Sequence, residues 1–196
     1  MAVEYFGNNT DGTTTDYGWG NYTLGNKATV WTCPGSGKYD LRELAYRGQH
    51  LLHTRIAIYT TSLAFVFQGI EDTSDQALEA WHTVTGFRNQ DGSTPTSPQL
   101  DGGTNYILMA SFAAGSGSSI RYSAGSSGDN GYFVGDNTSG FPATGPTLTS
   151  YAGVFCLRCG VEAAAAGGQS VCEVGLSPVR PPKPGTVTMR IRARTV

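Results

Sequence analysis

The sequence predicts an all-β protein: a two-sheet antiparallel β-sandwich (jelly roll) with an extended C-terminal arm. Short runs of β-branched and aromatic residues recur along the 196-residue chain and are bounded by Gly, Asn, Asp or Pro. Charged residues make up only 14% and glycines number 27, a neutral and turn-rich composition. A chain of this length forms one domain. We expect a sandwich domain at 1–176, a Pro-rich linker at 177–185 and an arm strand at 186–196.

The expected strands are 3–7, 20–25, 27–33, 39–48, 54–60, 63–70, 80–87, 104–112, 119–124 and 151–159. The segment 72–81 carries a helical signal, since Thr73 and Gln76 have capping-box spacing, so we expect a short helix or turn there. The polar segments 88–103 and 125–147 predict long surface loops, which in compact domains are often functional.

Proline occupies four of the nine positions in 177–185, which predicts a stiff, extended spacer. The following segment, 186–196, alternates as a strand does. Two interpretations stay open: an edge strand of the same sandwich, or an arm that adds to a sheet of another subunit. The arm residues expected to contact that partner are Arg190, Ile191, Arg192 and Arg194.

The net charge of -2 is unevenly distributed, because 174–196 carries five basic residues and no acid while the rest is acidic. An acidic body repels phosphate backbones, so we do not expect a nucleic-acid partner. No apolar run approaches the ~18 residues of a membrane-spanning helix. The N-terminus lacks the pattern of a secretory signal. Synthesis in a host cytoplasm and work outside it, as a virion component, would explain the extracellular type of composition; the alternative location is extracellular.

The four cysteines are Cys33, Cys156, Cys159 and Cys172. Only one C-x2-C pair occurs, which is half of a zinc pattern. Disulfides, free buried thiols and zinc all stay open. If the chain turns at 164–167, a hairpin would place Cys159 opposite Cys172 and leave Cys33 for Cys156. In a continuous strand, Cys156 and Cys159 would point to opposite faces.

Catalytic motifs are missing: no nucleophile elbow, phosphate loop or dinucleotide fingerprint occurs. The histidines His50, His53 and His82 form a weak metal pattern. We therefore expect a noncatalytic protein without cofactor or metal. A carboxylate pair, as in a small glycosidase, is the catalytic alternative. The glutamates considered for it are Glu43, Glu71 and Glu79.

Two tryptophans, Trp31 and Trp81, lie in apolar strand patterns and are expected in the core. Other aromatic residues lie in Gly- and Asn-rich surroundings, where exposed rings would stack on a sugar. These candidate ligand-binding residues are Tyr17, Trp19, Tyr22, Tyr122, Tyr132 and Phe133. The alternative is that the rings cover an end of the sandwich.

Several segments together resemble jelly-roll domains of the carbohydrate-binding-module type, which occur in extracellular surface proteins and phage virion proteins. They are FGN at 6–8, RIAIYT at 55–60, GTNYILMASF at 103–112, RYSAG at 121–125 and SYAGVF at 150–155. The resemblance covers roughly 5–160. It implies a two-sheet fold and a noncatalytic role that includes glycan binding. The Cys-bearing segment after 155 and the Pro-spaced basic arm depart from that type.

These observations lead us to expect a noncatalytic virion structural protein of the bacteriophage decoration, head-fibre or tail-associated kind. Its expected partners are other virion proteins, capsid or tail subunits, and host-surface polysaccharide, with assembly as a homo-oligomer. The alternative is a secreted carbohydrate-binding module or adhesin.

Overall fold

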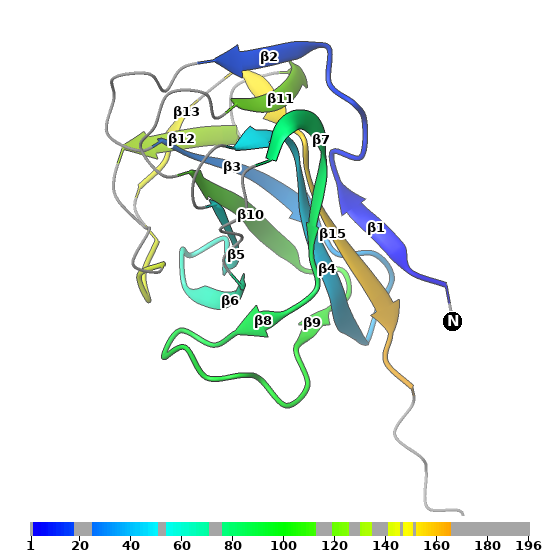
Figure 1. The fold of residues 1–196 in the computed structure, drawn as a ribbon. Helices are drawn as coiled ribbons and strands as arrows, with labels where there is room; N and C mark the ends of the chain where they lie inside the picture. Colours follow the sequence, from blue (N-terminus) through cyan, green and yellow to red (C-terminus); the bar gives the residue numbers. More distant parts are fainter. Residues whose placement is uncertain are drawn as a thin grey trace, which may run out of the picture. The chain divides into compact units, whose positions relative to one another are not determined.

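All regular structure in the described part of the chain is β-strand (Figure 1). The computed structural model describes residues 2–17, 25–50, 54–70, 76–112, 119–125, 130–134, 141–145, 147–150 and 152–165. No helix in these ranges is long and apolar enough to cross a membrane. Two antiparallel sheets confirm the predicted β-sandwich, whose compact unit spans Met1–Ala163. The predicted linker and arm lie outside the described residues.

The larger sheet has eight strands. It contains β1 (Glu4–Gly7), β2 (Thr14–Tyr17), β4 (Lys38–His50), β7 (Gln76–Val84), β9 (Gln99–Asp101), β11 (Ser119–Ala124), β14 (Gly153–Phe155) and β15 (Leu157–Ala163). Its main path runs β1-β15-β4-β11-β14, with β7 and β9 on β4 and β2 on β11. The long strand β4 therefore organises this sheet, because it pairs with four other strands.

The second sheet has seven strands in the order β13-β12-β3-β10-β5-β6-β8. They are β3 (Gly25–Thr32), β5 (Thr54–Thr60), β6 (Phe65–Gly69), β8 (Phe87–Arg88), β10 (Asn105–Phe112), β12 (Asn130–Val134) and β13 (Thr149–Ser150). Strand β10 lies centrally, paired with β3 and β5, and seven of its eight residues are buried. This burial explains its nearly continuous apolar sequence.

Two expectations about local structure are wrong. The segment 72–81 forms no helix in its described part, because residues from Gln76 onward pair with β4 as strand β7. The segment 125–147 is not entirely loop, since β12 pairs with β3. In the segment 88–103, a loop at 89–98 is followed by the short strand β9, which pairs with β4.

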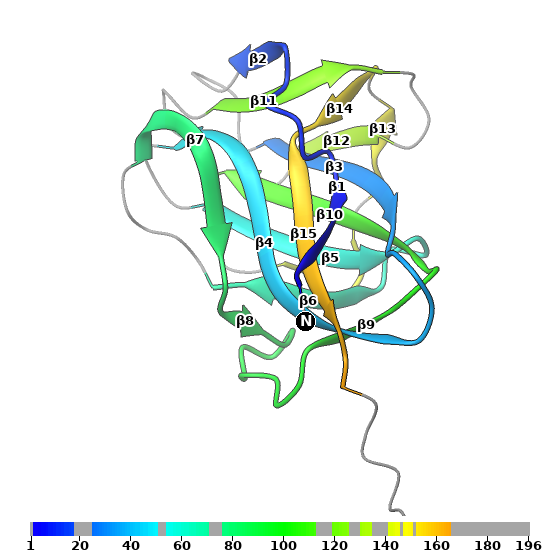
Figure 2. The same cartoon turned by 90° about the vertical axis from the view of Figure 1, so that its right-hand side faces the viewer.

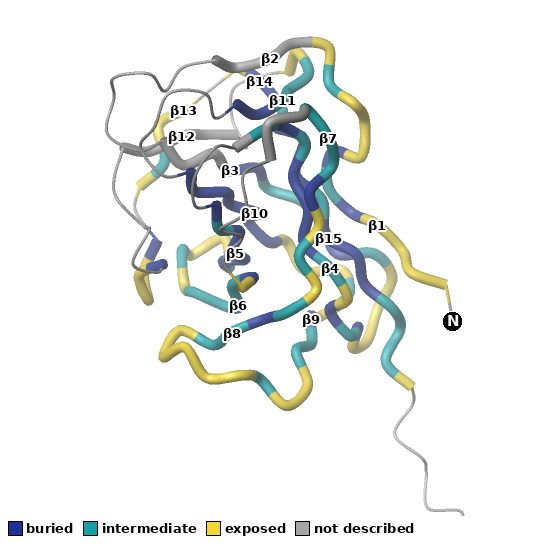
Figure 3. Tube along the Cα trace, viewed as in Figure 1, coloured by how far each residue is buried: buried dark blue, intermediate teal, exposed yellow. Residues whose placement is uncertain are grey.

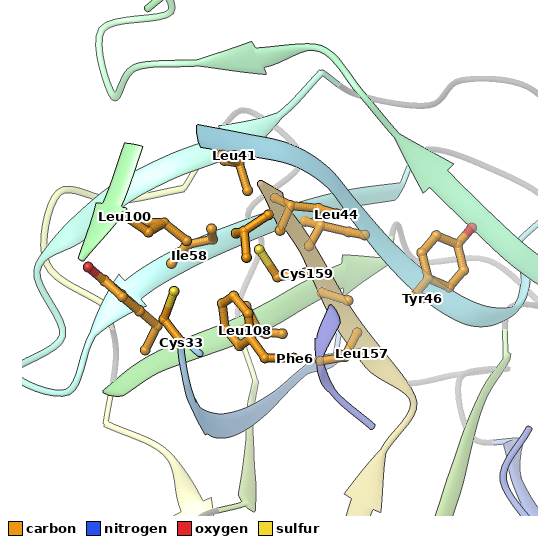
Figure 4. Packing of buried hydrophobic residues seen from close by; sticks show 14 of the residues in the cluster. Phe6, Cys33, Leu41, Leu44, Tyr46, Ile58, Leu100, Leu108, Leu157 and Cys159 are labelled. Carbon is orange, nitrogen blue, oxygen red and sulfur yellow. The ribbon is translucent and has the colours of Figure 1, made fainter. Parts of the chain in front are cut away.

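The main core fills the space between the sheets (Figure 4). Phe6, Leu44, Leu157 and Cys159 enter it from the larger sheet, and Leu108 enters from the smaller one. A second buried cluster includes Tyr59, Met109 and Phe141. Figure 3 shows the buried parts of the strands in dark blue and the loop between β8 and β9 largely exposed. Burial of these apolar side chains supplies most of the stability of such a fold.

Strand β15 is hydrogen-bonded on both sides. Cys159 lies opposite Phe6 of β1 on one side and opposite Leu44 of β4 on the other. A strand has only two hydrogen-bonding edges, so no third strand can pair with β15. Cys172, which the hairpin alternative set opposite Cys159, lies outside the described residues.

Candidate functional site

The candidate site is the outer face of the larger sheet, where β1, β15, β4 and β7 lie side by side (Figure 2). Successive residues of a strand point to opposite faces. In β4 and β15, Leu44 and Cys159 are fully buried in the core between the sheets. Their neighbours Glu43 and Arg158 consequently project outward, and Trp81 projects beside them from β7.

The guanidinium of Arg158 lies against two aromatic rings. Its Cζ atom is 4.3 Å from the ring centroid of Trp81 and 4.8 Å from that of Tyr5. We call Tyr5, Arg158 and Trp81 the stacked layer. Each cation–π contact contributes about 0.5–1 kcal/mol at an exposed site and more when water is excluded. The layer links β1, β15 and β7 across the outer surface of the sheet.

Gly160 makes room for the stacked layer. A Cβ atom at this position would lie 2.6 Å from Cγ of Glu43 and 3.1 Å from both Cε1 of Tyr5 and Cγ1 of Val3. These distances are shorter than normal carbon–carbon contacts. The absent side chain at Gly160 therefore allows Tyr5 and Val3 to pack directly on the backbone of β15.

Arginine–acid pairs surround the layer. Arg158 donates from Nη1 to Oδ1 of Asn9 at 2.6 Å and from Nη2 to Oε1 of Glu43 at 3.4 Å. Two further ion pairs lie on the same sheet: Arg47–Asp11 at 3.1 Å and Arg121–Glu79 at 3.3 Å. The glutamates Glu43 and Glu79 thus each face an arginine.

These arginines are largely covered by neighbouring atoms. The side chains of Arg158, Arg47 and Arg121 are 19%, 20% and 26% exposed. Long side chains held in this way have already lost most of their rotamer freedom, so a partner that binds here pays little further ordering entropy. Val3 and Tyr5 are the exposed apolar part of the face, at 39% and 43% exposure.

Three thiols are buried and free: Cys33, Cys156 and Cys159. For these three cysteines the structure shows the free-thiol alternative, so Cys33 and Cys156 are not paired in a disulfide; Cys172 lies outside the described residues. Burial raises the pKa of Cys33 and of Cys156 to about 11. Burial also raises the pKa of Cys159. A neutral thiol is a poor nucleophile, so these groups act as small apolar side chains.

Cys156 and Cys159 do not share one continuous strand, because Cys156 lies between β14 and β15, and their surroundings differ. Cys159 packs in the main core, whereas Nδ2 of Asn8 approaches the Cys156 sulfur at 3.6 Å. Within the described residues, no group of three His, Cys, Asp or Glu side chains is placed to hold a metal ion. His82 is buried, with Nε2 2.8 Å from the carbonyl oxygen of Gly48. The side chains of His50 and His53 lie outside the described part.

The predicted sugar-stacking residues are not brought together in the described part. The ring of Tyr122 packs against the main core, with its centroid 6.1 Å from that of Phe155, so it does not have the expected exposed position. The structure gives backbone but no side-chain positions for Tyr17, Tyr132 and Phe133. Trp19 and Tyr22 lie outside the described residues, as do Arg190, Ile191, Arg192 and Arg194.

The two tryptophans expected in the core lie in different environments. Trp31 packs against the main core, which confirms the prediction. For Trp81 it is wrong, because that ring stacks on Arg158 at the outer face. Sequence reasoning missed Tyr5 and Arg158 as site residues. The alternation of apolar and polar residues in 157–163 marks Arg158 as outward-facing, but nothing in the sequence identifies its neighbours.

No family model, no curated protein and no solved structure matches the chain.

Proposed function

We propose that this chain is a noncatalytic structural protein of a virus particle, of the bacteriophage decoration, head-fibre or tail-associated kind. It docks on another subunit of the particle through the outer face of β1, β15, β4 and β7. The observation that carries the proposal is the stacked layer of Tyr5, Arg158 and Trp81, with exposed Val3 beside it.

The chemistry of this face supports contact with a protein. Tyr, Trp and Arg are the residue types that dominate binding energy at protein interfaces. The surrounding ion pairs balance one another in charge: Arg158 with Glu43, Arg47 with Asp11, and Arg121 with Glu79. A charge-balanced face with an exposed apolar part fits a partner surface that is itself largely uncharged.

The C-terminal arm supplies a second contact in this proposal. Its alternating sequence satisfies its backbone hydrogen bonds by joining a sheet of another subunit. Arg190, Ile191, Arg192 and Arg194 then lie on that neighbour, and the stiff linker at 177–185 gives the reach. Truncation after Leu176 tests this contact: the proposal expects loss of incorporation into particles, and unchanged incorporation and oligomeric state would contradict it.

Incorporation of single variants tests the docking face. Tyr5 and Ile70 are both 43% exposed, so Tyr5→Ala and Ile70→Ala form a matched pair. Mass spectrometry of purified particles should show that Tyr5→Ala lowers recovery about tenfold or more, the effect of losing an anchor worth about 1.4 kcal/mol. Ile70→Ala should be recovered as the unchanged protein is. Equal recovery of both variants, with both folded by circular dichroism, would overturn the docking face.

A secreted carbohydrate-binding module is the competing function and predicts different results. The chain would then be missing from purified particles and would be retained on a polysaccharide affinity gel. Trp19→Ala and Tyr132→Ala would weaken that retention if the loop aromatics stack on the sugar.

A further inference from the structure

A pocket of about 370 Å³ is lined by residues near the start of β4 and by the loop at 89–98. Figure 1 shows this loop, which connects β8 to β9. The pocket lining consists of Asp40, Leu41 and Arg42 of β4, residues 85–87, and residues 94–98 of the loop. This volume is at the lower end of the range for small-molecule sites, about 300–1,000 Å³. None of its lining residues belongs to the stacked layer.

The loop that forms one wall is held by its own hydrogen bonds. The backbone N–H of Asn89 donates to the Ser93 carbonyl at 2.8 Å, and the N–H of Ser93 donates to Oδ1 of Asp91 at 2.9 Å. Near its other end, the N–H of Leu41 donates to the Pro98 carbonyl at 2.8 Å. Prolines at 95 and 98 further restrict the backbone. The wall is therefore shaped before any ligand arrives.

The charged side of the pocket is a fixed network. Arg42 donates from Nε to Oε2 of Glu162 at 2.8 Å and from Nη2 to Oδ2 of Asp40 at 3.1 Å. Nε2 of Gln99 donates to the other Asp40 oxygen at 2.8 Å. The pocket lining holds one carboxylate, Asp40, and one guanidinium, Arg42, so it offers no net positive charge to hold an anionic ligand. The Asp40 carboxylate keeps lone pairs that can accept from a neutral hydroxyl, and the Arg42 guanidinium keeps N–H groups that can donate to one.

The rest of the pocket lining is uncharged. Phe87 and Leu41 belong to the main core and are 7% and 3% exposed, so each offers only a small apolar area to the pocket, and Pro95 and Pro98 add apolar ring surface. Thr94, Thr96 and Ser97 add hydroxyl groups to the lining. Apolar and polar groups together in one small pocket suit a ring that has C–H faces and hydroxyl edges.

We propose that this pocket binds one neutral sugar ring, the end or a single unit of a glycan. Asp40 accepts from its hydroxyls, Arg42 donates to them, and the apolar surface of Phe87, Pro95 and Pro98 contacts its C–H face. The proposal stands apart from particle docking, because it uses neither the stacked layer nor the arm. It also differs from sugar stacking on the loop aromatics, since no predicted ligand-binding residue lines the pocket.

Saturation-transfer difference NMR on the full chain tests the proposal. The probes are D-glucose, D-galactose, D-mannose and N-acetyl-D-glucosamine, with D-glucuronate and N-acetylneuraminate as anionic sugars. We expect signals from at least one neutral sugar and weaker signals from the anionic ones. If none of the neutral sugars gives a signal, or only the anionic sugars do, the proposal is overturned.

Two bulky substitutions on the same loop locate the binding. Ser97 lines the pocket and Gln90 does not, and both are exposed. Ser97→Trp should abolish the neutral-sugar signals by filling the pocket, whereas Gln90→Trp should keep them. Arg42→Gln should weaken binding about tenfold through the lost charged hydrogen bond. Signals that survive Ser97→Trp would place the sugar elsewhere and contradict the assignment, whatever the outcome of the particle experiments.

Discussion

The two faces of the larger sheet are made of alternate residues of the same strands, yet they differ in how they exclude water. On the inner face, Leu44, Leu157 and Cys159 are fully buried side chains without charge. On the outer face, Arg158 and Arg47 are only about one-fifth exposed although they carry full charges. Two aromatic rings and Glu43 lie against Arg158, and Arg47 pairs with Asp11, so the outer face is ordered without being a core.

This difference separates stability from recognition within one sheet. Removing apolar atoms from the inner face leaves a cavity. Removing a group from the outer face exposes atoms that water can reach, so the free energy of unfolding changes less. For side chains of similar size, truncation on the inner face should therefore lower the free energy of unfolding more than truncation on the outer face.

The largest effect is expected for Leu44→Ala. Leu44 is 0% exposed in the main core, so its truncation should lower the free energy of unfolding by about 2–5 kcal/mol. Urea unfolding followed by tryptophan fluorescence measures this change. A loss well below 1 kcal/mol would mean that the inner face is not packed as described.

The next effect is expected at the end of β1. Gly7 has a φ of +116°, and a Cβ there would collide with the carbonyl oxygen of Leu157. Gly7→Ala should cost about 1–3 kcal/mol, because the strained backbone cannot shift without breaking the β1–β15 ladder. The same urea titration checks it, and an unchanged midpoint would show that β1 leaves the sheet differently.

The buried thiols predict lower stability in alkali. Burial, with Asp101 and Glu4 nearby, raises the pKa of Cys33 from 9.0 to about 11. The unfolded chain therefore loses this proton first, so the stability contributed by the neutral thiol is complete below pH 9 and is lost as the pH rises toward 11. The loss should reach about 2–3 kcal/mol.

A comparison with Cys33→Ala isolates this contribution from other groups that titrate in alkali. The unfolding free energy of the unchanged protein should fall more steeply between pH 9 and 11 than that of the variant. Parallel curves for the two proteins would contradict the assignment.

The smallest effect is expected in the stacked layer. A double-mutant cycle with Arg158→Ala and Trp81→Ala should give a coupling of about 0.5–2 kcal/mol. Lys38 and Asp101 form an exposed ion pair at 2.7 Å and serve as the control cycle. Their coupling should be smaller, since solvent screens exposed charges. Equal coupling energies in the two cycles would mean that the stacking of Arg158 on Trp81 is worth no more than an exposed ion pair.

Most of the sandwich follows from local patterns, and the exceptions have physical causes. The predicted strands 54–60 and 119–124 coincide with β5 and β11, because short runs with β-branched and aromatic residues favour the strand conformation. The helical signal in 72–81 failed because pairing with the long strand β4 outweighs local propensity. Strand β12 was missed because it forms by pairing with β3, a distant partner.

The candidate site was harder to predict because register decides which face a residue occupies. Tyr46 lies opposite His82 and Arg47 lies opposite Trp81. This register turns His82 inward and Trp81 outward, against the usual preference of the two residue types. Tyr5 and Arg158 meet only because β1 pairs with β15, a neighbour relation that no single-sequence pattern contains.

The double pairing of β15 also has a mechanical consequence. Interstrand hydrogen bonds run perpendicular to the strands, and β15 has a ladder on each side. When the body is held by its outer face and tension is applied to the chain after Ala163, both ladders are loaded in shear. Many bonds must then rupture together, rather than one after another as in peeling. A segment anchored in this way would resist extraction by force far better than an edge strand of equal length.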